Sequence, residues 1–87
     1  MKAYDIFVYN GEFELLDSAT VECEPSELLQ ELHYYAEVNA EYEDMDASEW
    51  REIVIDTDEP SVCWYDEFNE LMLSVYAYAS EEAIAGA

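Results

Sequence analysis

The 87-residue sequence contains 23 Asp and Glu residues but only two side-chain cations, Lys2 and Arg51, and its formal net charge is −21. At this length we expect one domain with a small core. Such an excess of negative charge repels nucleic acid and anionic lipid, so neither is an expected partner. No apolar run is long enough for a membrane span and residues 1–10 do not resemble a signal peptide, so we expect a cytoplasmic protein.

Disorder, adaptation to high salt and simple solubility are three general explanations for this acidity. Disordered acidic chains are poor in hydrophobic residues, whereas hydrophobic residues make up 52% of this chain and follow ordered patterns. Halophilic proteins also carry extreme net charge, but the aromatic content of 15% is higher than we expect for them. A salt-adapted protein, or one whose charge serves only solubility, remains an alternative to a specific binding role.

The N-terminal residues predict a β-hairpin. Residues 3–9 are rich in aromatic and β-branched side chains and lead into Asn10-Gly11, a strong signal for a two-residue turn in which both residues have positive φ. Polar and apolar side chains then alternate from Glu12, as in a half-buried strand. We therefore expect the hairpin to cover residues 3–23.

A helix is predicted over residues 25–40. Pro25 is typical of a first helical turn, where its missing N–H costs nothing. At 100° per residue, one face of this helix is apolar and the opposite face is acidic. The expected apolar face contains Leu28, Leu29, Leu32, Tyr35, Ala36 and Ala40.

The second half of the chain predicts further strands joined by turns. We expect strands over residues 51–56 and 62–65, with an acidic connection before the first and a turn between them. Residues 66–70 read as a turn, and residues 71–79 fit either a strand or a helix, although Tyr76 and Tyr78 favour the strand. The result is an α+β fold, a single small domain in which a mostly antiparallel sheet packs on one helix. We expect the core to contain most of the aromatic residues Phe7, Phe13, Trp50, Trp64 and Phe68.

Carboxylates gather on the outer helix face, in the connection 41–49 and in the turn 56–59. An ordinary surface helix intersperses Lys or Arg with Glu, and this one has neither. Tyrosines among carboxylates suit a surface that binds Lys and Arg through ion pairs and cation–π contacts. A solvated polar face is the ordinary explanation for such a stripe, and tyrosines often lie at the rim of a core. We predict a partner-binding surface formed by Glu24, Glu27, Glu31, Tyr34, Glu37, Glu41, Tyr42, Glu43, Asp44, Asp46, Asp56, Asp58 and Glu59.

Catalytic and metal chemistry find little support in the sequence. Cys23, His33 and Cys63 lack the short spacing of a zinc site, and the acidic segments do not fit a calcium-binding loop. A thiol in this negative environment stays protonated, so we expect reduced, buried cysteines. We therefore predict no enzymatic activity, no cofactor and no metal.

In size, charge excess and combination of tyrosine with carboxylates, the whole chain resembles the small acidic DNA-mimic proteins of phages and mobile elements, the anti-CRISPR and anti-restriction inhibitors. These inhibitors share no common motif, so no residue role is carried over. The resemblance implies a protein, monomeric or a small homo-oligomer, that occupies the basic nucleic-acid-binding surface of a bacterial defence complex, with a CRISPR effector favoured. The alternative is a binding module for another basic protein, such as a restriction enzyme, repressor, glycosylase or histone-like protein.

Overall fold

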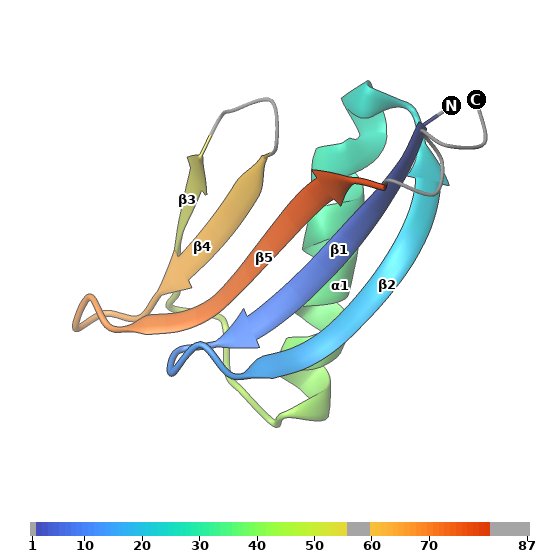
Figure 1. Cartoon of the computed structure of the whole chain (residues 1–87). Helices are drawn as coiled ribbons and strands as arrows, with labels where there is room; N and C mark the ends of the chain where they lie inside the picture. Colours follow the sequence, from blue (N-terminus) through green and yellow to red (C-terminus); the bar gives the residue numbers. More distant parts are fainter. Residues whose placement is uncertain (1, 56–59, 81–87) are drawn as a thin grey trace.

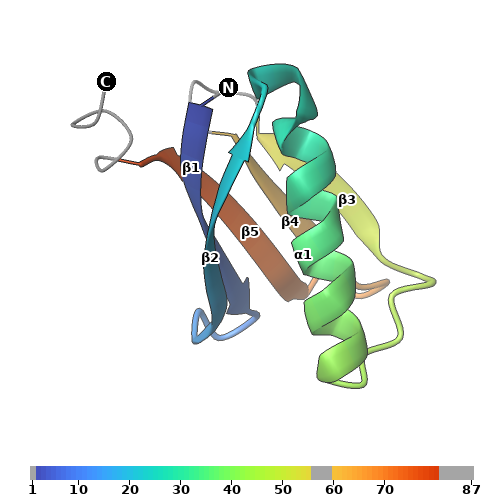
Figure 2. The same cartoon turned by 90° about the vertical axis from the view of Figure 1, so that its right-hand side faces the viewer.

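A five-stranded sheet with one helix on one of its faces forms the described part of the protein (Figures 1 and 2). The computed structural model describes residues 2–55 and 60–80. Asp56, Asp58 and Glu59, predicted to bind a partner, lie outside the described residues. Across the described ranges, no helix has the length and apolar character needed to cross a membrane.

The sheet is antiparallel throughout, with strand order β2-β1-β5-β4-β3. The first and last of the described strands, β1 and β5, pair with each other in the interior of the sheet, and β2 and β3 form its two edges. The predicted α+β fold is confirmed, and the segment that fitted both strand and helix is a strand, β5. The strands are β1 (Lys2–Asn10), β2 (Leu15–Cys23), β3 (Arg51–Ile55), β4 (Ser61–Tyr65) and β5 (Leu71–Ala79).

The helical segment consists of a short 3-10 turn, η1 (Pro25–Glu27), and the helix α1 (Leu28–Tyr42). The helix packs mainly on β5 and β1, with a smaller contact to β2. The expected burial of Leu29 is wrong: this side chain is 39% exposed, and it lies one helical turn before His33, which contacts Trp64 and Glu52 at the side of the helix. Asn39, which is not on the expected apolar face, is buried, and its side-chain amide donates to the Tyr35 carbonyl at 2.8 Å.

The core lies between α1 and the sheet, and the opposite face of the sheet is not covered by any described helix (Figure 2). Alternation along β1 and β5 sends Tyr4 and the aliphatic side chains toward the helix, and it sends Phe7, Tyr9, Tyr76 and Tyr78 to the uncovered face. Cross-strand ring pairs form there, with centroids of Phe7 and Tyr78 5.9 Å apart and those of Tyr9 and Tyr76 5.6 Å apart. The fully buried side chains of the core include Ile6, Val8, Leu32, Val62, Leu73 and Val75.

The turn between β1 and β2 differs from the two-residue turn that Asn10-Gly11 predicts. Strand β2 begins only at Leu15, and the residue with positive φ is Phe13, at 60°, not Gly11. The physical reason is the Asn10 side chain, whose Oδ1 accepts hydrogen bonds from the backbone N–H groups of Glu12 and Glu14, both at 2.9 Å. This capping stabilises a longer turn, which removes Glu12 and Glu14 from the strand.

The turn between β4 and β5 repeats the same structure. Asp66 Oδ1 accepts from the backbone N–H groups of Phe68 at 2.8 Å and Glu70 at 2.9 Å, and Asn69 has a φ of 63°. Each turn projects one phenylalanine into solvent, with Phe13 63% and Phe68 76% exposed. The expectation that these two rings belong to the core is therefore wrong, because both lie at turn tips beyond the end of the sheet.

Candidate functional site

The outer face of α1 and η1 carries a stripe of carboxylates that faces away from the sheet. Glu37 and Glu41 are exposed, as is Tyr34 at 57%, while Glu31 is half-buried on the flank. The Tyr34 ring meets the Tyr35 ring edge-on, with centroids 5.2 Å apart, which holds one tyrosine of the stripe in a defined position. We call this surface the acidic stripe; it consists of Glu27, Glu31, Tyr34, Glu37 and Glu41.

The density of charge along the acidic stripe approaches that of one DNA strand. Spread over the accessible surface of 5,897 Å², the net charge of −21 amounts to about 280 Å² per charge, whereas duplex DNA carries one charge per ~110 Å² if treated as a cylinder of ~10 Å radius. Four carboxylates occur between Glu27 and Glu41, a helical length of about 21 Å, over which one DNA strand has about six phosphates. The charge density of the stripe is therefore closer to that of a single DNA strand than the average charge density of the protein surface is to that of a duplex.

The stripe continues past the C-terminus of α1 because of how the helix ends. The N–H of Met45 donates to the Ala40 carbonyl at 2.8 Å, and the N–H of Asp44 to the Glu41 carbonyl at 3.1 Å. With Asp44 in the left-handed region at a φ of 56°, these bonds form a Schellman motif. The chain turns here, and it does so without a basic side chain in the last helical turn to offset the negative end of the helix dipole.

Two more predicted binding residues, Tyr42 and Asp46, lie at the same end of the helix. Tyr42 is 87% exposed. Hydrogen bonds from Ser48, chiefly from its backbone N–H at 3.1 Å, lower the pKa of the Asp46 carboxyl. Asp46 therefore stays ionised to lower pH than an isolated carboxyl. The exposed carboxylate of Asp46 and the exposed ring of Tyr42 extend the acidic stripe.

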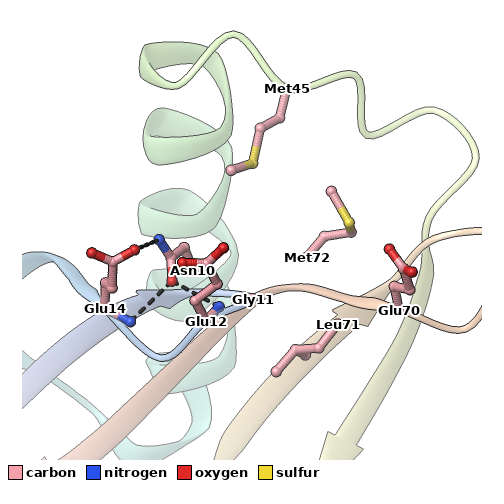
Figure 3. A pocket seen from close by; sticks show the side chains of 8 residues that line it. All are labelled: Asn10, Gly11, Glu12, Glu14, Met45, Glu70, Leu71 and Met72. Atoms are coloured by element: carbon pink, nitrogen blue, oxygen red, sulfur yellow. Dashed lines mark hydrogen bonds between the residues drawn. The ribbon is translucent and has the colours of Figure 1, made fainter.

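A second concentration of carboxylates forms where both hairpin turns meet the end of α1. The three segments lie at the same end of the molecule (Figures 1 and 2) and surround a hollow of about 550 Å³. Figure 3 shows Met45 and Met72 extending into the space between the helix and the turns, with carboxylates on both sides. We call this region the acidic end; Glu12, Glu14 and Glu70 line the hollow, and Glu43 and Asp44 belong to the region because they follow α1 directly before Met45.

The predicted binding residues thus divide into separate groups. Those from Glu27 to Glu41 form the acidic stripe, Tyr42 and Asp46 extend it, and Glu43 and Asp44 join the acidic end. Glu24 lies before η1, at the opposite end of the helical segment. The turn carboxylates Glu12 and Glu14 were missed because the alternation around them indicates a strand, and the capping role of Asn10 was the available signal for a longer turn.

The cysteines and the histidine do not form a reactive centre. Cys23 and Cys63 are free and buried. Burial raises the pKa of both thiols, and the carboxylates of Glu31, Glu27 and Glu24 raise that of Cys23 further. Both thiols are therefore protonated at neutral pH and poor nucleophiles. Among the described residues, no group of three or more His, Cys, Asp and Glu side chains is arranged to hold a metal ion.

Comparisons with protein-family models, with curated proteins and with solved structures find no match to this chain. What the chain can do must therefore be inferred from its own surface. The acidic stripe and the acidic end are the most unusual features of that surface, because they concentrate repelling charges that stability alone would disperse.

Proposed function

We propose that this protein is a polyanion mimic that binds the basic nucleic-acid-binding surface of a bacterial defence complex, with a CRISPR effector as the favoured target, and prevents that complex from binding DNA. The observation that carries the proposal is the acidic stripe without a single cation. The two cations of the chain lie elsewhere: Lys2 is on β1, and Arg51 on β3 donates to Asn69 Oδ1 at 2.8 Å and lies 5.8 Å from the centre of the Tyr65 ring.

The carboxylates of the stripe would stand in for phosphates and pair with Lys and Arg side chains of the target. Complementary charge accelerates encounter, so association is fast and weakens steeply with salt. Tyr34 and Tyr42 add apolar area and cation–π contacts to the same surface. Both rings are already exposed in the free protein, so the surface needs little rearrangement before it binds.

Competition with DNA tests the proposal directly. Purified CRISPR effector complexes are mixed with fluorescently labelled target DNA, and DNA binding is measured by anisotropy as the protein is added. We expect the protein to displace DNA, and we expect Glu37→Lys to weaken displacement about tenfold, equivalent to ~1.4 kcal/mol. Effectors that capture their DNA unimpeded at saturating protein would rule out this target class.

A matched control separates position from total charge. Glu22 on β2 is exposed like Glu37, but its side chain points to the face of the sheet opposite α1, as its pairing with Ala3 shows. Glu22→Lys changes the net charge as much as Glu37→Lys does, and we expect it to alter displacement less than twofold. Equal losses for the two variants would mean that bulk charge, rather than a placed surface, drives binding.

A different basic DNA-binding protein as target is tested by affinity capture. The protein is immobilised and exposed to bacterial lysate with and without nuclease treatment, and bound proteins are identified by mass spectrometry. Capture of a restriction enzyme, repressor, glycosylase or histone-like protein in place of a CRISPR effector would redirect the proposal to that partner while leaving the acidic stripe as the binding surface.

A further inference from the structure

A small hollow lies between α1 and the strands β3 and β4, to one side of the strands on which the helix mainly packs. It has a volume of about 280 Å³, which is slightly below the usual range for pockets that hold a whole small molecule and suits a single side chain. Three of its lining residues are alanines, two on α1 and one in the connection after it, and a larger side chain at these positions would occupy part of the hollow. The hollow is lined by His33, Ala36, Glu37, Ala40, Ala47, Trp50, Glu52 and Trp64.

Two indole rings form the aromatic part of this hollow. Trp50 and Trp64 are half-buried and pack against the core, so each ring is anchored on one side and open on the other. The His33 ring meets Trp64 edge-on, with centroids 5.9 Å apart, and its Nε2 is in contact with Glu52 Oε1. These contacts hold the Trp64 ring and the Glu52 carboxylate in place before any ligand arrives.

Two carboxylates lie at the rim of the hollow. Glu37 reaches it from α1 and Glu52 from β3, so the two negative charges come from different elements. The contact with His33 uses one oxygen of Glu52, and a carboxylate has a second oxygen that can accept hydrogen bonds. An aromatic wall with anionic groups at its rim is the arrangement that binds an organic cation, since the indole face and the carboxylates both attract positive charge.

We propose that this hollow, the indole pocket, binds an arginine side chain of the partner. The planar guanidinium stacks on an indole and donates to carboxylates in a fixed fork, whereas the lysine ammonium is a compact, strongly hydrated charge that loses more on entering a half-buried pocket. The aliphatic part of arginine would lie along the alanines. Glu37 belongs to both the indole pocket and the acidic stripe, so the arginine enters beside the surface that binds the other cations.

This inference rests on the proposed function in one respect, namely that the partner is rich in arginine and lysine. Its chemistry is tested without any partner. The chain contains two tryptophans, and both line the indole pocket, so intrinsic tryptophan fluorescence reports on this site alone. The probes are N-acetyl-arginine amide, N-acetyl-lysine amide and N-acetyl-citrulline amide, the last of which has nearly the shape of arginine without its charge.

We expect saturable quenching or a spectral shift with the arginine amide, a response at least threefold weaker with the lysine amide and none with the citrulline amide. Glu37→Gln should weaken arginine binding several-fold, while Glu22→Gln, which removes an equal charge far from the pocket, should not. Equal responses to arginine and citrulline, no saturation with arginine, or equal effects of the two substitutions would each overturn the assignment.

A second measurement separates the indole pocket from the proposed function. Trp64→Phe keeps an aromatic ring against the core but reduces the cation–π attraction, because indole is the strongest of the three rings. If the protein displaces DNA from its target and Trp64→Phe displaces it equally well, the indole pocket is wrong and the proposed function stands. If the arginine amide binds but no DNA-binding complex is inhibited, the indole pocket stands and the proposed function is wrong.

Discussion

Replacing Glu41 by lysine is expected to stabilise the fold and to weaken binding to a basic partner. Glu41 is exposed in the last turn of α1, four residues after Glu37, with Glu43 and Asp44 directly beyond it. In the native chain these charges repel one another and also face the negative end of the helix dipole. The substitution reverses both effects at one position.

The size of the gain follows from two contributions. The like-charged pair with Glu37 costs about 0.2–0.5 kcal/mol, and a Glu–Lys pair in the same order and spacing gains a similar amount. Near the C-terminus of a helix, removing an exposed anion and introducing a cation each add at least about 0.3 kcal/mol to the stability. The total is about 1–2 kcal/mol at low salt, which for a domain of this size corresponds to a Tm increase of at least ~4 °C.

Thermal unfolding followed by circular dichroism measures this gain at 10 mM and at 1 M NaCl. The Debye length falls from ~30 Å to ~3 Å between these conditions, so the Tm difference between Glu41→Lys and the native protein should nearly vanish at high salt. Glu41→Gln, which removes the charge without adding another, should give about half the gain. A Tm that is unchanged or lower for Glu41→Lys at 10 mM NaCl, or a gain that persists at 1 M, would refute the reasoning.

Three further predictions concern the turns and the thiols. Gly11→Ala should lower Tm by several degrees in the same melting assay, because an added Cβ would lie 2.0 Å from the backbone carbonyl oxygen of Leu71. Relieving such overpacking costs about 1–3 kcal/mol. A Tm within one degree of the native value would contradict this close approach. Phe13→Gly should raise the free energy of unfolding in urea by about 1 kcal/mol, since glycine adopts the φ of 60° without strain and the Phe13 ring is exposed. A loss of stability would show instead that the ring makes a stabilising contact. Cys23 and Cys63 should react with a thiol reagent only as the protein unfolds, and rapid labelling of the folded protein at pH 7 would disprove this. Because burial raises the pKa of both thiols, their contribution to stability is complete at neutral pH and is lost as the pH rises above the ordinary thiol pKa of 9.0.

The acidic stripe was predictable because it depends on a local regularity. Helical period and the absence of Lys and Arg are properties of neighbouring residues, so Glu27, Glu31, Glu37 and Glu41 fall on one face wherever the helix is placed. Runs of β-branched and aromatic residues likewise indicated most of the strands, and together with the helix they predicted the α+β fold. Leu29 marks the limit of this reasoning, since its exposure depends on which strands the helix covers.

The acidic end and the indole pocket were decided by tertiary structure. The turns at Asn10 and Asp66 are 56 residues apart in sequence, and they meet the end of α1 only because β1 pairs with β5 at the centre of the sheet. Trp50 and Trp64 face one hollow because the helix packs mainly on β1 and β5, which leaves a space between the helix and the strands β3 and β4. The sequence by itself determined how much charge each element carries, whereas strand order, which depends on contacts between distant residues, determined which of those charges lie together.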